Sequence, residues 1–252
     1  MKRSLLNGSD AAEVAGIIRR NGGVVALTGA GISVDSGIPD FRSGGGLWER
    51  YDPAEYATLS AFKRDPAKVW AFFRELEAPL ARARPNRGHL ALKDLEERGL
   101  LTAVITQNID NLHTAAGCAR VIELHGSTAR MRCIGCRAVY ARATVEGLAL
   151  GWPPACPACG APVKPDVVLF EEPLPAEALA AAADAVAGAK VLLTVGTSGL
   201  VSPANAIPHA AKRAGATVVE VNLEETVLTA AVTDYFVKGS SSTVLPEIVR
   251  LV

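Results

Sequence analysis

The sequence predicts an α/β fold, in which a doubly wound parallel sheet carries a smaller domain formed by two insertions. Short apolar runs end near residues 28, 106, 124, 195 and 221, and each is followed by small or polar residues. Helical periodicity fills most of the intervals between them, and this alternation is typical of parallel sheets covered by helices. Two closely spaced cysteine pairs lie in one interval, which predicts that a metal-binding unit interrupts the sheet.

The composition argues against several classes of protein. The chain has 252 residues, and 49% of them are hydrophobic, which is enough for a sizeable core. Its formal net charge is zero, which argues against binding nucleic acid through bulk electrostatics. Residues 1–10 lack the apolar stretch of a secretory signal, and no run reaches the roughly 18 apolar residues of a membrane span. We therefore expect a cytoplasmic protein with no membrane partner.

The first helix and strand lead into a glycine turn. An apolar stripe and a capping aspartate predict a helix over Asp10–Asn21, and the run Val24–Thr28 predicts a buried strand. The turn Gly29-Ala30-Gly31 allows backbone N–H groups to approach an anion, although the third glycine of G-x-G-x-x-G is missing. Gly37-Ile38-Pro39 excludes a regular helix next. The turn alone is compatible with simple packing, but with the polar and aromatic residues 40–42 behind it we predict a nucleotide site in a long loop.

Aromatic residues concentrate in the next segment. Eight of the 13 lie between Phe41 and Phe73, in a pattern that is irregular at first and then helical. Two interpretations stay open: a small helical core, or an apolar wall over a ligand site. A further helix begins after the capping residue Asn86 and ends at Gly99.

Polar side chains crowd the end of the next strand. Leu101–Thr106 is an apolar run, and amide or carboxylate side chains occupy four of the five positions 107–111 that follow it. One such side chain would suffice to cap a helix. The carboxyl ends of parallel strands are where open α/β sheets bind ligands, so this cluster predicts a binding site.

One histidine is a candidate general base. His125 follows the short strand Val121–Leu124 and precedes a glycine, which gives it access to a cleft. Imidazole has a proton affinity suited to base catalysis near neutral pH. The other three histidines favour structural roles, since His89 and His209 lie in helical patterns and His113 lies at a helix start.

The cysteines predict a structural zinc site. Cys133 and Cys136 form one C-x-x-C pair, Cys156 and Cys159 form another, and 19 residues separate the pairs. This spacing is typical of four-thiolate zinc ribbons, in which all four positions on the metal are filled and none remains for a catalytic water. The fifth cysteine, Cys118, is expected to be a buried thiol.

The second half of the chain repeats the strand and helix alternation. Strands are expected over Lys164–Phe170, Lys190–Val195 and Thr217–Val221, and helices over Ala176–Ala189, Ser202–Ala214 and Leu245–Val252. A second small-residue turn, Gly196–Gly199, follows one strand, and Asn222 and Glu224 follow another at a position suited to ribose hydroxyls.

These elements divide the chain into two parts. Residues 1–44, 86–127 and 166–252 are expected to form a Rossmann-like nucleotide-binding domain. Residues 45–85 and 128–165 are expected to form the small helical and zinc-binding domain. A cleft between the two parts is the default ligand site.

The motifs together resemble one family. GAGIS, GIPDFR, TQNIDNLH, the HG after VIEL, the paired C-x-x-C, KPDVVLF, GTS and NLE have the order and spacing of the sirtuins, the NAD-dependent protein-lysine deacylases. The likeness covers nearly the whole chain, as one catalytic domain over 1–252. It is the bacterial and archaeal type of deacetylase that the sequence resembles.

The resemblance implies a set of site residues. His125 matches the catalytic base and Asn108 a catalytic amide, and the four paired cysteines match ligands of one structural Zn²⁺. The implied NAD contacts are Gly29, Ala30, Gly31, Ser33, Asp40, Phe41, Arg42, Gln107, Asn108, Asp110, Gly196, Thr197, Ser198, Asn222, Glu224 and Ser241. The implied contacts with substrate are Phe73, Leu76, Val168, Phe170, Glu171, Leu200 and Val201.

The resemblance also implies a reaction. The acetyl group of a lysine would pass to ADP-ribose, with release of nicotinamide, free lysine and O-acetyl-ADP-ribose. His125 would accept a proton from a ribose hydroxyl. An acetylated protein or peptide would bind as a strand between Val168–Glu172 and Leu200–Ser202, with loose sequence selectivity. We expect a monomer that binds no specific nucleic acid.

Two departures from the family pattern bear on substrate choice. Phe73 and Leu76 stand where sirtuins that prefer acidic acyl groups carry Tyr and Arg, so we expect acetyl or longer apolar acyl groups to be preferred. Glu171 stands where the family usually has Gly, and Ser202 where an aromatic residue or His is common. The alternatives are a mono-ADP-ribosyltransferase and a non-catalytic zinc-ribbon module that binds protein or DNA; a dehydrogenase is disfavoured by the missing glycine.

Overall fold

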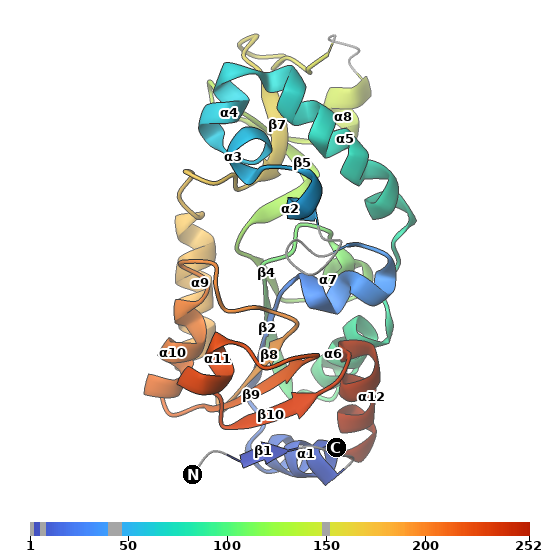
Figure 1. Ribbon diagram of the computed structural model, residues 1–252, viewed down its shortest axis with the longest axis vertical. Helices are drawn as coiled ribbons and strands as arrows, with labels where there is room; N and C mark the ends of the chain where they lie inside the picture. The colour runs from blue at the N-terminus through green and yellow to red at the C-terminus, as the bar shows by residue number, and fades with distance from the viewer. Residues whose placement is uncertain (1–2, 6–8, 40–46, 148–151) are drawn as a thin grey trace.

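The protein consists of two stacked parts. The computed structural model describes residues 3–5, 9–39, 47–147 and 152–252. The larger part, in the lower half of Figure 1, is built around a parallel sheet, and the smaller part above it contains further helices and a second sheet. Both ends of the chain lie at the bottom of the larger part.

The large sheet has seven parallel strands in the order β1-β10-β9-β8-β2-β3-β4. From β2 the chain builds outward through β3 and β4, and then crosses to the other side of β2 and builds outward through β8, β9 and β10. The change of direction between β2 and β8 is the switch point at which such sheets bind ligands. The strands are β1 (Arg3–Leu5), β2 (Val24–Thr28), β3 (Leu101–Thr106), β4 (Val121–Glu123), β8 (Val191–Val195), β9 (Thr217–Asn222) and β10 (Tyr235–Lys238).

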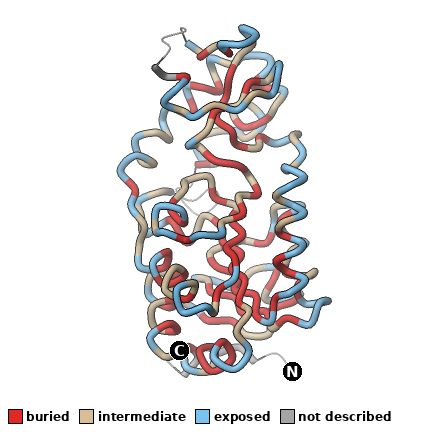
Figure 2. Tube along the Cα trace, turned by 180° about the vertical axis from the view of Figure 1, so that it is seen from behind, coloured by how far each residue is buried: buried red, intermediate tan, exposed pale blue. Residues whose placement is uncertain are grey.

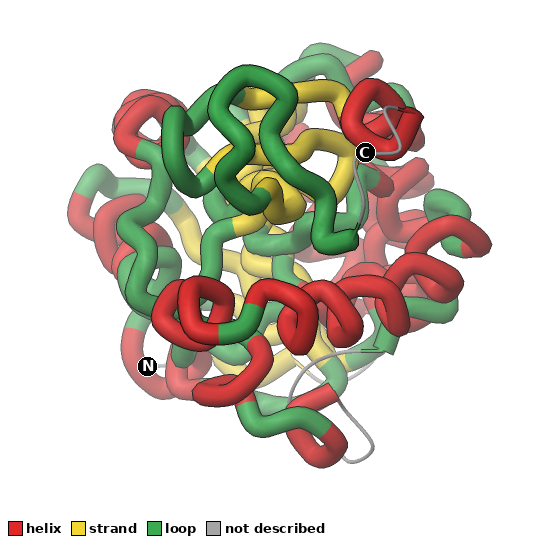
Figure 3. Tube along the Cα trace, turned by 90° about the horizontal axis from the view of Figure 1, so that it is seen from above, coloured by secondary structure: helices red, strands yellow, loops and turns green. Residues whose placement is uncertain are grey.

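Side chains of β2 alternate between two apolar cores, one on each face of the sheet. Val24 and Ala26 pack in the core that contains residues of α1 (Ser9–Asn21), α6 (Arg87–Glu97) and α12 (Ser241–Leu251). Val25 and Leu27 pack in the other core, with residues of α9 (Ala176–Ala187) and α10 (Ala206–Arg213). Because both faces are covered, every residue of β2 and β8 is buried, which explains their continuous apolar sequences. Figure 2 shows the buried residues along the inner strands, and Figure 3 shows helices around them.

The two insertions share a third core and form the smaller part. Phe62 and Trp70 come from the first insertion, and Met131 and Val163 come from the second. The Trp70 indole N–H donates to the main-chain oxygen of Val163 at 2.8 Å, which ties the insertions together. The three-stranded antiparallel sheet is β6 (Val139–Ala141), β5 (Gly126–Cys133) and β7 (Val163–Val167). The helices are α2 (Leu47–Arg50), α3 (Pro53–Tyr56), α4 (Leu59–Arg64), α5 (Pro66–Arg82) and α8 (Arg142–Gly147).

The fold class and the fully buried strands are confirmed, and several details differ from expectation. The strand expected over Lys164–Phe170 is β7, which ends at Val167 and pairs antiparallel with β5. The predicted long loop after Gly29 instead begins as a 3₁₀ helix, η1 (Ala30–Ser36), because Gly37 lies after the helix as its left-handed cap residue and does not interrupt it. The expected segment borders near 128 and 165 stay a prediction; the small sheet runs from Gly126 to Val167.

Three helices begin at residues other than those expected. Helix α1 begins at Ser9, α10 begins at Ala206 after a turn at 202–205, and α12 begins at Ser241. The early start of α12 brings Pro246 inside the helix. The remaining helices are α7 (Leu112–Ala115) and α11 (Val227–Ala231). No helix in the described ranges is both long and apolar enough to cross a membrane.

Candidate active site and metal centre

A cavity of about 1100 Å³ lies between the large sheet and the smaller part. One wall is formed where β2, β3, β8 and β9 end, and the other by side chains of α2 and α5 and the segment after β7. Most residues predicted to bind NAD or substrate line it: Gly29, Ala30, Gly31, Phe73, Leu76, Gln107, Asn108, His125, Val168, Phe170, Glu171, Gly196, Thr197, Ser198, Val201, Asn222, Glu224 and Ser241. The cavity therefore gathers residues that are up to 212 positions apart in sequence.

The glycine turns after β2 and β8 pack directly on each other. The Gly29 N–H donates to Val195 O at 3.0 Å, and the Gly31 N–H donates to Gly196 O at 2.9 Å. A Cβ at Gly29 would lie 2.7 Å from Gly196 O, and one at Gly31 would lie 2.7 Å from Gly196 Cα. Glycine is required here for close packing of two backbones, and the same packing leaves the turns open toward the cavity.

The far end of the cavity contains a buried hydroxyl without a partner. Ser241 is 6% exposed and lines the cavity at the first position of α12, and its Oγ makes no hydrogen bond within the described residues. The amide of Asn222 donates to Thr197 O at 3.1 Å, which joins the turns after β8 and β9. A buried polar atom without a partner gains free energy when a polar ligand supplies a hydrogen bond. The glycine cradle and this hydroxyl fit an extended dinucleotide such as NAD.

His125 is held in one tautomer. Its Nδ1 lies 2.8 Å from the main-chain oxygen of Gln107, and because a carbonyl only accepts, Nδ1 carries the proton. The unprotonated Nε2 is then the basic atom. Burial lowers the pKa of His125, and the bond to Gln107 partly opposes that shift. The imidazole is therefore neutral near pH 7, as a general base must be.

A second, smaller pocket adjoins the first near Asn108. Its volume is about 40 Å³, and Ser33, Asn108 and Asp110 line it together with apolar side chains. The amide of Asn108 donates to Gly29 O and to Ser33 Oγ, each at 3.1 Å, and the Ser33 hydroxyl donates to Asp110 at 2.7 Å. Burial raises the pKa of Asp110, whereas bonds from the Leu112 N–H and the Ser33 hydroxyl lower it. Ser33 and Asp110 thus lie beside the main cavity rather than in its wall.

His89 and His113 are buried and do not line the cavity, which agrees with the structural roles expected for them. His113 Nε2 lies 2.9 Å from the Thr28 hydroxyl, which donates to Thr106 Oγ1 at 2.9 Å. The rings of His89 and His113 lie 4.8 Å apart, and both side chains are buried. Burial lowers the pKa of His89 to about 4. Burial and then the nearby His89 lower the pKa of His113 to about 3.

The four paired cysteines come together at one end of the small sheet. Their sulfur atoms all lie within 4.8 Å of one another, with Cys133 Sγ 3.5 Å from Cys159 Sγ and Cys136 Sγ 3.7 Å from Cys156 Sγ. In a tetrahedral site with Zn–S bonds of about 2.3 Å, neighbouring sulfurs lie roughly 3.8 Å apart. The Tyr140 hydroxyl lies 3.2 Å from Cys156 Sγ and can support a thiolate ligand. The cluster could hold one structural zinc ion, and Cys118 is buried elsewhere.

Some predicted site residues do not line the cavity or lie outside the described residues. Leu200 is 58% exposed and does not line the cavity, because it lies at the tip of the turn whose next residues, Val201 and Ser202, do. Asp40, Phe41 and Arg42 lie outside the described residues. Both interpretations of the aromatic segment hold, since Phe72 and Phe73 belong to the third core and also line the cavity.

The sequence analysis did not predict the hydrogen bonds that hold the loop after β9 on the buried Glu220. Thr226 lines the cavity, and its hydroxyl donates to Glu220 Oε1 at 2.6 Å. Glu220 is 1% exposed and also accepts bonds from Thr229 and Thr233. A glutamate inside an apolar strand, followed by a T-x-x-T capping pattern, was the available signal.

Comparison with known proteins identifies the family. A model of the Sir2 family matches residues 29–203. NAD-dependent protein deacylase 2 of Pyrobaculum aerophilum is 48% identical over 238 residues, which cover 94% of each chain. A solved structure described as "Structural Basis for the Mechanism and Regulation of Sir2 Enzymes" has a TM-score of 0.90 and 42% identity, over 97% of this chain and 98% of that one. Another, "Sir2-p53 peptide-NAD+", has a TM-score of 0.85 and 34% identity, over 94% and 96%. The chain belongs to the Sir2 family.

Proposed function

We propose that this protein is an NAD-dependent protein-lysine deacylase that transfers an acetyl group from lysine to ADP-ribose. The observation that carries the proposal is the position of His125. Its Nδ1 is fixed on Gln107 O, and it lines the same cavity as the glycine turns and the segment after β7. A base, a dinucleotide cradle and a strand-like edge in one cavity are what this chemistry needs. The names of the relatives agree with it.

The chain's own residues hold and orient the reactants. Bound NAD supplies a ribose carbon at which the amide oxygen of acyl-lysine displaces nicotinamide, and a ribose hydroxyl that later receives the acyl group. The small pocket is lined by the Asn108 amide, the Ser33 hydroxyl and the Asp110 carboxylate. These groups would hydrogen-bond the carboxamide of nicotinamide. His125 Nε2 accepts the proton of the ribose hydroxyl, which makes that oxygen nucleophilic.

The peptide is expected to bind along the segment after β7. Within the described residues, the Val168 carbonyl and the N–H and C=O of Glu171 have no hydrogen-bond partner, and both residues line the cavity. Unpaired main-chain groups at a cleft are what an extended peptide adds to. One solved relative is described as a complex with a p53 peptide and NAD⁺, and we infer the same class of substrate, acetylated lysine in proteins or peptides, for this chain.

The acyl group would enter beside apolar side chains. Phe73 and Leu76 line the cavity, and no Lys or Arg side chain does so within the described residues. A carboxylate on the acyl chain would lose water there without gaining a cation. We therefore infer a preference for acetyl and other apolar acyl groups.

The remaining assignments are also proposals. We infer that the protein acts as a monomer in the cytoplasm. Its formal net charge of zero supports the absence of a specific nucleic-acid partner. Residues 1–44, 86–127 and 166–252 serve as the NAD-binding domain, and residues 45–85 and 128–165 as the small domain. Zinc on the four cysteines keeps the second insertion folded.

The test is an assay with one acetylated peptide, with and without NAD, read by mass spectrometry. Loss of the acetyl group only when NAD is present supports the proposal. A mono-ADP-ribosyltransferase would instead release nicotinamide regardless of peptide acetylation and leave the acetyl group in place. No reaction in either condition, from a folded protein, would favour a non-catalytic zinc-ribbon module.

A further inference from the structure

The five residues Val168–Glu172, here called the peptide segment, are attached to both parts of the molecule. At one end the Val168 N–H donates to His125 O at 2.8 Å. In its middle, the Phe170 N–H donates to Ala57 O at 2.8 Å, and Phe170 O accepts from the Leu59 N–H at 3.0 Å. The segment therefore bridges the candidate base and the short helices of the smaller part.

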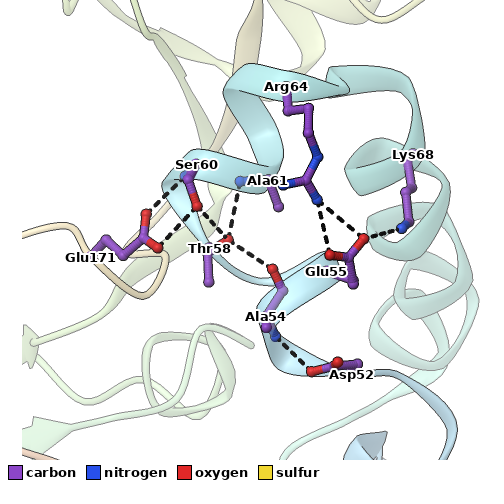
Figure 4. Close-up of polar contacts among 9 residues, drawn as sticks. All are labelled: Asp52, Ala54, Glu55, Thr58, Ser60, Ala61, Arg64, Lys68 and Glu171. Carbon is purple, nitrogen blue, oxygen red and sulfur yellow. Dashed lines mark hydrogen bonds and ion pairs between the residues drawn. The ribbon is translucent and has the colours of Figure 1, made fainter.

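Glu171 adds a side-chain attachment to this bridge. Its Oε2 accepts from the Ser60 N–H and its Oε1 accepts from the Ser60 hydroxyl, both at 2.9 Å, as Figure 4 shows. The two residues are 111 positions apart in sequence. Ser60 lies in the first turn of α4, where a backbone N–H has no partner inside the helix. The carboxylate thus supplies an acceptor that the helix itself lacks.

The backbone of Glu171 has a conformation that disfavours glutamate. Its φ is +74°, in the left-handed region, which disfavours a residue with a Cβ relative to glycine. The two bonds to Ser60 can offset that cost, since bonds to a charged group are stronger than neutral ones. The conformation of the segment at this residue therefore depends on its side chain.

The carboxylate of the neighbouring residue, Glu172, makes local bonds instead. Glu172 Oε2 accepts from the Leu169 N–H at 2.8 Å and lies 2.9 Å from Lys164 Nζ, so its bonds stay within β7 and the segment. Of these two carboxylates, that of Glu171 is the one that bonds to a helix of the smaller part among the described residues, and it does so at the residue whose main-chain N–H and C=O remain unpaired there.

We propose that Glu171 is a positioning residue for the acylated peptide. Its carboxylate, bound to Ser60, holds the peptide segment in the form that presents the Val168 carbonyl and the Glu171 main chain to the substrate. This rests on the proposed deacylase function. If the attachment is lost, only a fraction of molecules has the competent segment, and the apparent affinity for peptide falls by that fraction.

The test compares four variants with one matched control. Glu171→Ala, Glu171→Gly and Glu171→Gln remove or weaken the carboxylate, and Ser60→Ala removes one donor. The control is Glu55→Gln, because the Glu55 carboxylate pairs with Arg64 and Lys68 inside the smaller part and makes no contact with the segment (Figure 4).

We expect Glu171→Ala and Glu171→Gly to raise KM for an acetylated peptide about 3- to 10-fold, with kcat and KM for NAD within about twofold of wild type. Glu171→Gln and Ser60→Ala should have smaller effects, and combining them should give less than the sum of their separate effects. Glu55→Gln should leave peptide KM unchanged. Glu171→Gly is the most informative variant, because it removes the bonds to Ser60 without leaving a strained backbone at this residue.

A measurement without substrate separates this proposal from the proposed function. Hydrogen exchange of the Ser60 amide should accelerate in Glu171→Ala and not in Glu55→Gln. A wild-type enzyme without NAD-dependent turnover overturns both the proposed function and this inference. If the wild-type enzyme shows NAD-dependent turnover, either of two results overturns this inference alone. These are an unchanged peptide KM in Glu171→Gly and an unchanged rate of Ser60 amide exchange in Glu171→Ala.

Discussion

His125 and Gln107 are joined by a 2.8 Å hydrogen bond from the imidazole Nδ1 to the main-chain oxygen. The Gln107 side chain in turn donates to Thr197 Oγ1 at 2.8 Å. The orientation of the base is therefore linked to the ends of both β3 and β8, the strands on either side of β2. Because the acceptor is a main-chain atom, no side-chain substitution at Gln107 removes this bond directly.

The activity should depend on pH through His125. Burial holds the pKa of this imidazole below its usual value near 6.5, so the neutral base form persists to lower pH. We expect kcat/KM to rise with pH, to reach half its maximum below pH 6.5, and to be level by pH 7.5. The measurement is a pH profile of kcat/KM with acetylated peptide; a midpoint above pH 7 would contradict the assigned environment.

Acid should destabilise the protein through the buried histidine pair. The folded-state pKa values of His89 and His113 are lowered to about 4 and about 3, whereas the unfolded values are near 6.5. Between these limits the unfolded chain binds more protons, so stability is lost as pH falls below 6.5. Each histidine contributes up to about 1.4 kcal/mol per pH unit in that window.

Denaturant unfolding between pH 7 and pH 4 measures this effect. The variant with His89→Gln and His113→Gln should show a flatter dependence of unfolding free energy on pH, even if it is less stable at pH 7. His209→Gln, a half-exposed histidine on α10, serves as the control. If unfolding free energy has the same slope against pH in the wild type, the double variant and His209→Gln, the buried pair does not cause the acid sensitivity.

Loss of the metal should locally unfold the smaller part of the molecule. Cys133 and Cys156 belong both to the sulfur cluster and to the third apolar core. Cys136→Ser should therefore lower bound zinc from one per chain to none and reduce the Tm by more than about 5 °C. Cys118→Ala is the control, because burial raises the pKa of that thiol to about 11 and it lies outside the cluster. Full zinc content in Cys136→Ser would refute the assignment.

Acyl-group choice should depend on Phe73 and Leu76. Both line the cavity without a neighbouring cation among the described lining residues, so a succinyl group would leave its carboxylate unpaired. With one peptide in two acylated forms, kcat/KM should favour acetyl over succinyl by at least about 10-fold. Leu76→Arg should raise the succinyl to acetyl ratio. Faster succinyl turnover by the wild-type enzyme would mean that the pocket was misinterpreted.

The parallel strands could be predicted because burial on both faces leaves a continuous apolar run, as in Val24–Thr28 and Val191–Val195. Strand β5 could not, because its partly exposed charged side chains pair with residues of other strands. Arg130, for example, pairs with Glu123 and Asp166. A sequence pattern does not reveal which charges find partners across the fold.

Many residues that line the cavity were predictable from motifs at strand ends, and their mutual geometry was not. The contact between Gly31 and Gly196 and the bond between Glu171 and Ser60 join segments more than 100 positions apart. The helix start at Ser241 was missed because its Ser-Ser-Thr sequence carries no apolar period before Val244. Long-range contacts of this kind depend on how the elements pack, which local patterns do not specify.

The central claim is that His125 and the nucleotide cradle act on one acylated lysine in one cavity. The most direct test is product analysis by mass spectrometry, with NAD and an acetylated peptide, for wild type and His125→Ala. The account predicts equal amounts of deacetylated peptide, nicotinamide and O-acetyl-ADP-ribose from the wild type, and at least about a 100-fold loss of deacetylation in a folded, zinc-loaded His125→Ala. Wild-type rates in that variant would contradict the account.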